Sequence, residues 1–265
     1  MIKALAKNSM VAVMLAAVGS LSATAPAQAL SVVFQDRDVS RTISLGGTCN
    51  GCELSGRDLS GARMAGASFN NSTFIGANLR GASMLGSNFS GSDFERADIR
   101  GANLAGSVFR NSALEQARMT GVVAAGTTFS GSDLTNATVD NAELTGAIFR
   151  AADLTRVDFR GSRMVGTTLV NVDATRANFT SAELISANMG SSDFTNANFT
   201  GARLDNSRLR GSDFSRANFH NASLRRTDIR GADLSDARNL TQSQINQACG
   251  DSSTELPRGL RVSTC

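Results

Sequence analysis

The chain of 265 residues contains no tryptophan and no tyrosine, although it has 14 phenylalanines. Both missing side chains combine a large ring with a polar group. The interior therefore accepts flat apolar rings and excludes rings with a polar tip. This selection indicates one packing environment that is repeated many times along the chain.

Groups that carry catalysis are also scarce. His220 is the single histidine, and we expect it to be an exposed repeat residue. The sequence has no nucleophile elbow, no phosphate-binding loop and no histidine-containing metal spacing. It therefore predicts a protein that is not an enzyme and needs no cofactor and no metal.

Lysine is nearly absent, because the only two, Lys3 and Lys7, stand before a short apolar run and the small residues 27–29. This order is typical of a secretory signal, so we predict a signal peptide over residues 1–29 and a mature chain from Leu30. No segment reaches the length of a membrane helix. We expect a periplasmic or secreted protein without membrane insertion after cleavage; retention as an uncleaved anchor is the alternative.

Removal of the signal leaves an almost neutral chain. The 26 basic residues less these two lysines leave 24 arginines against 23 carboxylates, a net charge of +1. This balance supports neither a basic nucleic-acid patch nor an acidic imitation of DNA. We therefore expect no nucleic-acid partner.

A five-residue period runs through most of the chain. Every fifth residue from Leu54 to Leu234 is large and apolar, except Ala124 and Ala174. The residue two places before this centre is nearly always small, with Cys52 and Arg57 as the exceptions in the first coil. The next residue is often Asp or Asn, and the last of the five is often Gly or Asn. Because five matches neither the period of a helix nor that of a strand, each repeat must be a short extended piece plus a corner. Two such repeats are Ser87-Asn88-Phe89-Ser90-Gly91 and Ala102-Asn103-Leu104-Ala105-Gly106.

These repeats resemble the pentapeptide repeat family, whose motif is a small residue, Asp or Asn, Leu or Phe, and two variable residues. The resemblance covers residues 52–236 and implies an all-β fold, a right-handed quadrilateral β-helix with four repeats in each coil. About nine coils would form a rod of about 45 Å, in which residues twenty apart stack. When the central residues are grouped in steps of twenty, phenylalanines fall in two columns. One column contains Phe69, Phe89, Phe109, Phe129 and Phe149, and the other contains Phe159, Phe179, Phe199 and Phe219.

Both ends of such a solenoid need caps, because they leave backbone groups unpaired. We expect a short helix over residues 241–249, with Thr241 or Ser243 as N-cap and Gly250 just past its end. The expected domains are the signal peptide 1–29, an N-terminal cap 30–51, the β-helix 52–236, and a C-terminal helix and tail cap 237–265.

Four cysteines in an exported protein predict two disulfides. Cys49 and Cys52 lie at the first coil, whereas Cys249 and Cys265 lie beyond the last. Bonds along the rod would exceed the limit of about 7 Å between Cα atoms, so we predict Cys49 with Cys52 and Cys249 with Cys265. A redox or metal role for the first pair is the alternative, although no thioredoxin-like pattern or second ligand pair accompanies it.

One face carries small and apolar residues on its outside, each followed by glycine in the first six coils. It forms an apolar strip, and such patches mark interaction surfaces. We expect an unknown protein partner or a second copy of the chain to dock there, although small residues also suit a corner. The strip comprises Ala65, Gly66, Leu85, Gly86, Ala105, Gly106, Ala125, Gly126, Thr145, Gly146, Val165, Gly166 and Ile185.

Another face carries an aspartate every twenty residues, from Asp133 to Asp233. Stacked carboxylates repel unless they accept hydrogen bonds or bind cations. Local turn bonding is the simpler expectation, and nearby Arg156, Arg176 and Arg216 would relieve the repulsion.

The sequence thus predicts a non-catalytic exported scaffold for protein–protein interaction in the cell envelope. The resemblance implies one alternative, the DNA-mimicking topoisomerase inhibitors of the family. That role requires a strongly acidic face and a location in the cytoplasm, and this sequence matches neither requirement. A cation-binding envelope protein that uses the aspartates is the other alternative.

Overall fold

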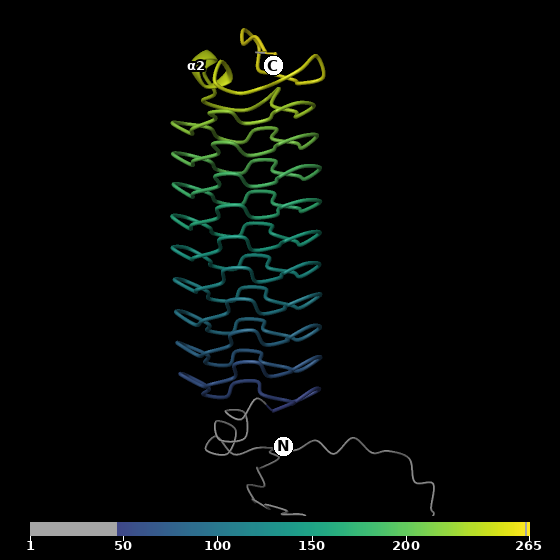
Figure 1. Cartoon of the computed structure of the whole chain (residues 1–265), viewed down its shortest axis with the longest axis vertical. Helices are drawn as coiled ribbons and strands as arrows, with labels where there is room; N and C mark the ends of the chain where they lie inside the picture. The colour runs from purple at the N-terminus through teal and green to yellow at the C-terminus, as the bar shows by residue number, and fades with distance from the viewer. Residues whose placement is uncertain (1–46, 263) are drawn as a thin grey trace, which may run out of the picture. The chain divides into compact units, whose positions relative to one another are not determined.

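The computed structural model describes residues 47–262, 264 and 265, and these residues form a regular stack of coils (Figure 1). The predicted signal peptide and residues 30–46 of the predicted N-terminal cap lie outside the described residues. The coils already include Thr48, which pairs with Ser68.

Parallel bridges join each coil to the next. From Thr48 to Asn218, the residue before each centre pairs with the residue twenty positions later. The backbone N–H of the central residue then donates a hydrogen bond to a carbonyl of the following coil, as the Phe109 N–H does to the Thr128 carbonyl at 2.7 Å. Within the described part, each side of a coil holds single bridge residues between turns rather than a longer strand. Since a repeat has five residues, this pairing gives four repeats in each coil, as expected.

The coil has four sides, which we name after the centre that starts each column. The Leu54, Leu59, Met64 and Phe69 sides continue in steps of twenty residues. Every corner residue from Gly51 to Gly231 has a positive φ, whether it is a glycine or, as at Asn136 and Arg226, a larger residue. The left-handed conformation strains most side chains, which explains why Gly and Asn prevail at these corners.

The centres fill the interior with stacked rings. Phe109 and Phe129 stack at 5.3 Å between ring centroids, as do Phe159 and Phe179. Both predicted columns are therefore confirmed. An edge contact of 5.8 Å between Phe149 and Phe159 joins the column of the Phe69 side to that of the Leu59 side.

Buried hydroxyls connect the coils at the corners, a role that the sequence interpretation missed when it assigned these residues only as small. The Ser92 hydroxyl donates to the Phe69 carbonyl at 2.6 Å, and Ser112 donates to the Phe89 carbonyl at 2.8 Å. The same Ser92 oxygen accepts from the Ser72 N–H at 3.1 Å. Such bonds satisfy polar groups that burial would otherwise destabilise.

The C-terminal helix α2 spans Gln242–Ile245 and has Thr241 as its N-cap in a capping box with Gln244. It ends at Ile245, so the expected end at Cys249 is wrong. The reason is that Cys249 pairs with Asp228 and extends the bridge ladder of the last coil. The Gln244 side chain also caps that coil, since it donates to the carbonyl of Phe219 at 2.8 Å.

The disulfides pair as predicted, Cys49 with Cys52 and Cys249 with Cys265, at Cα separations of 5.6 and 5.3 Å. The second bond ties the tail to the ladder residue Cys249. Each disulfide therefore crosslinks residues at one end of the described coils.

Candidate functional site

The predicted strip lies on the Met64 side, one residue past each centre. Leu85 is 47% exposed and Ala65 is also exposed, whereas Val165 and Ile185 are half-buried. The glycine after each of these residues forms the exposed corner in the first six coils. The strip is therefore most open in its N-terminal coils.

The glycine corners of this side make it nearly flat. A Cβ added at Gly86 or Gly106 would meet no atom within 4 Å, so the glycines leave open space beside the strip. Their φ of 63° and 67° explains part of the preference for glycine. The same corner accepts Ser186, Asn206 and Arg226 in later coils, so the fold does not require glycine there.

Val123 belongs to this surface, although the sequence interpretation did not include it. It stands one residue before its centre, a position that often holds Asp or Asn, and its side chain is 43% exposed. Val123 and Leu85 are two of the three large apolar residues that are exposed in the described part, and both lie on the Met64 side. The sequence did contain a sign of this exposed residue, because an apolar side chain stands at a repeat position that is usually polar. We call Leu85, Ala105, Val123 and Ala125 with the corner glycines 66–126 the apolar half.

Charged residues take over the later coils of the same side. The Glu143 carboxylate lies 3.3 Å from Arg163, and Arg163 lies 3.6 Å from Glu183. Arg203 continues the series at 3.1 Å from Glu183. These ion pairs run beside Val165 and Ile185 and confine the open apolar surface to the earlier coils. We call the residues from Glu143 to Arg226 on this side the charged half.

The aspartates of the Leu54 side bond locally. The Asp153 carboxylate accepts from the Thr155 N–H at 2.8 Å, and Asp193 accepts from the Thr195 N–H at 2.7 Å. These bonds link each carboxylate to the backbone of its own repeat, as local turn bonding predicts. In the part of the chain that the structure describes, no group of three or more His, Cys, Asp or Glu side chains could hold a metal ion.

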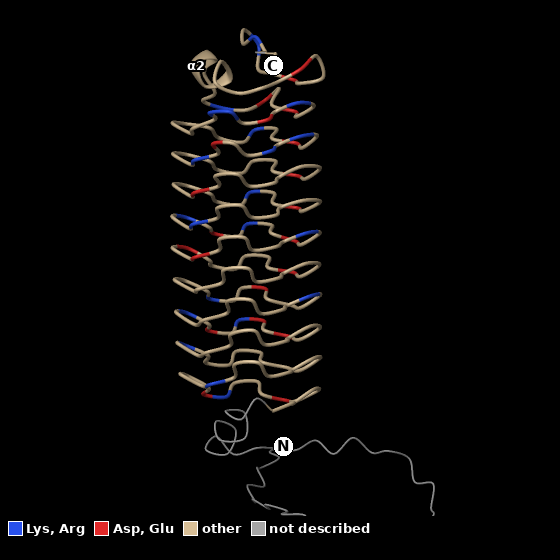
Figure 2. Ribbon diagram, viewed as in Figure 1, with Lys and Arg blue, Asp and Glu red and all other residues tan. Residues whose placement is uncertain are grey.

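His220 is exposed, and its ring lies 3.2 Å from the Asn221 amide. Charges of both signs occur along the whole stack (Figure 2). Carboxylates outnumber arginines on the Leu54 side, which carries Asp93, Glu115 and the aspartates from Asp133 to Asp233. No helix among the described residues is both long and apolar enough to cross a membrane.

Two family models, both described as pentapeptide repeats, match the chain. One matches residues 87–190 and 197–249 in overlapping segments, and the other matches residues 50–93. A comparison with curated proteins finds no match.

Solved structures with this repeat are similar over much of the chain. HetL from the cyanobacterium Nostoc, involved in heterocyst differentiation regulation, is 26% identical over 78% of this chain and 86% of its own, with a TM-score of 0.32. QnrB1, a plasmid-mediated fluoroquinolone resistance protein, is 19% identical over 78% of this chain and 92% of its own, with a TM-score of 0.40. A pentapeptide repeat protein of the Arabidopsis thaliana thylakoid lumen is 23% identical over 54% of this chain and 75% of its own, with a TM-score of 0.26. From its family models and its repeats, the chain belongs to the pentapeptide repeat family, whose members fold as right-handed quadrilateral β-helices.

Proposed function

We propose that this protein is an exported, non-catalytic scaffold that binds a protein partner in the cell envelope through the apolar half of the Met64 side. The observation that carries the proposal is the exposure of Leu85 and Val123, at 47% and 43%, on a side with open glycine corners. A flat surface of this kind removes apolar area from water when another protein covers it. A second copy of the chain is the competing occupant.

Export is supported by two features of the chain. The first 29 residues carry the pattern of a secretory signal. All four cysteines are paired in disulfides, which persist in oxidising compartments such as the periplasm. Mass spectrometry of the protein from the periplasmic fraction tests this part, and a start at Leu30 with both disulfides is expected. A chain that keeps its first 29 residues in the cytoplasm would contradict it.

Site-specific photocrosslinking tests the docking surface. A photoreactive residue at position 85 should give a defined crosslinked product in cells, whereas one at Glu95, on the opposite Leu54 side, should give none. Mass spectrometry of the product then distinguishes a different protein from a second copy of this chain. Equal crosslinking from both positions would contradict a dedicated surface.

A double variant that introduces two positive charges sharpens this test. Leu85→Arg with Val123→Arg should abolish the crosslink from the neighbouring position 105 and should shift the melting temperature by less than about 3 °C. The fold already accepts arginine at both positions of this side, since Arg225 and Arg203 stand there in later coils. Ile148→Arg is the matched control, because Ile148 is 37% exposed on the Phe69 side. It should leave the crosslink unchanged.

A further inference from the structure

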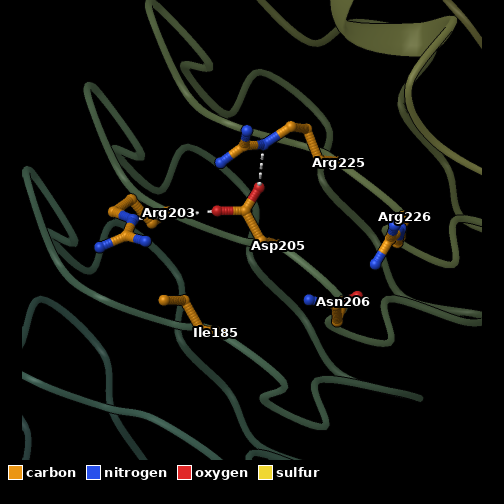
Figure 3. Close-up of a pocket in the computed structure, with 6 residues that line it drawn as sticks. All are labelled: Ile185, Arg203, Asp205, Asn206, Arg225 and Arg226. Carbon is orange, nitrogen blue, oxygen red and sulfur yellow. Dashed lines mark hydrogen bonds and ion pairs between the residues drawn. The ribbon is translucent and has the colours of Figure 1, made fainter.

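A pocket of about 350 Å³ lies at the C-terminal end of the charged half (Figure 3). Its volume falls within the range of small-molecule sites, at the lower end. It has no role in the proposed docking surface, which lies in earlier coils. The residues that line it are Ile185, Arg203, Asp205, Asn206, Arg225 and Arg226.

Asp205 forms the floor of this pocket. It takes the position that Leu85 and Ala105 hold in earlier coils, yet it is only 6% exposed, the one charged residue so deeply buried in the described part. One carboxylate oxygen accepts from the Ser223 hydroxyl at 2.5 Å and from Arg225 Nε at 3.2 Å. The other oxygen has no hydrogen-bond partner among the described residues and lies 3.8 Å from Arg203 Nε.

The charge of Asp205 is maintained in spite of its burial. Burial alone would raise the pKa of this carboxyl, but the hydrogen bonds from Ser223 and Arg225 and the charges of Arg225 and Arg203 outweigh burial. The pKa therefore lies below its ordinary value of 3.8. The ionised carboxylate accepts a hydrogen bond from Arg225 and attracts Arg203 at 3.8 Å, and both arginine side chains remain at least half exposed. Asp205 thus acts as a positioning residue for Arg225.

Most of the side-chain N–H donors beside Asp205 have no hydrogen-bond partner among the described residues. Arg225 bonds Asp205 through Nε, and its two terminal nitrogens make no hydrogen bond within the described part of the chain. The same holds for the side chains of Arg226 and Asn206, which Figure 3 shows on the opposite wall of the pocket. The charged half carries one more arginine than carboxylates when Arg226 is counted, so the ion pairs alone do not neutralise this end.

We propose that this pocket binds a small oxyanion, a carboxylate or phosphate group, through Arg225, Arg226 and Asn206. Guanidinium groups match the two oxygens of a carboxylate or phosphate, and a group fixed in advance loses less freedom on binding.

Titration of the purified chain with inorganic phosphate and, separately, with acetate tests the site, with sodium chloride holding the ionic strength constant. Amide NMR signals of residues 203–206 and 225–226 should shift in a saturable way with at least one probe. The probe that saturates at the lower concentration identifies the preferred group. Shifts that grow linearly with both probes, or that scatter over arginines on all four sides, would overturn the proposal.

The double variant Arg225→Gln with Arg226→Gln should weaken the saturable binding at least tenfold. Gln116 already occupies a corner at a φ of 57°, so glutamine is acceptable at position 226. Arg150→Gln with Arg216→Gln is the matched control, because it removes one arginine past a centre and one corner arginine on other sides. Binding in the control should equal that of the parent chain. An equal loss in both double variants would show a general charge effect and overturn the site.

Discussion

The two halves of the Met64 side differ in their outward charge yet share one backbone. In the apolar half, the Gly86 N–H donates to the Ala105 carbonyl at 2.9 Å; in the charged half, the Asn206 N–H donates to the Arg225 carbonyl, also at 2.9 Å. The corner φ changes only from 63° at Gly86 to 59° at Asn206. Replacing glycine and alanine by asparagine and arginine therefore leaves the coil unchanged.

The inward side chains therefore determine the backbone of the coil, whereas the outward residues of each column can vary without changing that backbone. Met84 and Leu204 are both fully buried beneath these contrasting surfaces. Function in this protein is then a property of columns of outward residues twenty apart. Predictions that separate the two halves, or exchange their residues, test this view.

The largest effect is expected from deleting residues 132–136. Removing one repeat turns every later coil by a quarter, so the charged half leaves the Met64 side and Phe149 no longer stacks on Phe129. The mismatched core should lower the free energy of unfolding by about 3 kcal/mol or more. Thermal unfolding followed by circular dichroism measures the loss.

Deleting residues 132–151 is the control for that change. It removes one full coil, keeps both halves on one side, and brings Phe159 beside Phe129 in the relation it has with Phe149. A shorter stack with a single cooperative transition is expected, because each coil contacts only its neighbours. If this deletion proved as harmful as the shorter one, twenty-residue stacking would not govern the fold.

A smaller effect is expected from placing asparagine at equivalent positions of the two halves. Asp205→Asn should lower the free energy of unfolding by about 1–2 kcal/mol, because Arg203 and Arg225 lose their charged partner. Leu85→Asn should change it by less than about 0.5 kcal/mol, because Leu85 is largely exposed. Urea denaturation of both variants measures the difference.

The loss of folding free energy in Asp205→Asn should depend on pH. Since the folded pKa of Asp205 lies below its ordinary value of 3.8, its charge contributes stability that is complete above that value and is lost as pH falls through the folded pKa. The losses in the two variants should therefore differ at pH 7 and converge once the pH lies below the folded pKa of Asp205. A difference that persists unchanged in acid would contradict the pairing with arginine.

Glu115, on the Leu54 side, lies in an environment that disfavours its charged form, in contrast to Asp205. Burial raises its pKa, and the nearby charges of Asp133, Asp93 and Glu95 raise it further. Because the folded pKa is raised, the ionised form lowers stability at neutral pH, and this cost disappears as pH falls below the ordinary range of a glutamate. Glu115→Gln should therefore stabilise the protein at pH 7 by less than about 1 kcal/mol and have no effect near pH 3. Urea denaturation at both values checks the sign.

The smallest effect is expected from Gly106→Asn, which gives the apolar half the corner residue of the charged half. A Cβ at Gly106 meets no atom within 4 Å, and Asn206 holds the same corner at a φ of 59°. The melting temperature should fall by less than about 2 °C. Gly131→Asn is the contrasting variant, because its Cβ would collide with the Asn111 side chain. It should lower the melting temperature more.

The interior of the coil could be predicted from sequence because it depends on period alone. The Phe159 and Phe179 stack and both disulfide pairs follow from residue spacing and are confirmed. The four-repeat coil, which the family resemblance implies, is confirmed by the bridges between residues twenty apart. The pattern depends on one small and one large inward residue in each repeat, and its five-residue spacing continues from Leu54 to Leu234 without an insertion.

The surface pocket and the end of α2 could not be predicted, for two physical reasons. Arg203 can pair with Asp205 of its own repeat or with Glu183 one coil earlier, and Arg225 reaches Asp205 from the next coil, so the sequence alone does not place both arginines beside Asp205. The helix ends at Ile245 because the last coil offers unpaired backbone to Cys249, a competition that local helix signals do not contain. Asp205 did carry a signal, since it is a charged residue in a column of small and apolar ones.

Amide hydrogen exchange of the native chain tests most directly that one backbone lies beneath both surfaces. Each corner N–H on the Met64 side, from Gly66 to Asn206, donates to the next coil at 2.9 Å. We predict that corner amides of the apolar half and those of the charged half exchange with the same opening free energy, within about 1 kcal/mol. Rapid exchange of Gly86 and Gly106 beside slow exchange of Ser186 and Asn206 would show that the outward side chains shape the coil, and would contradict the account.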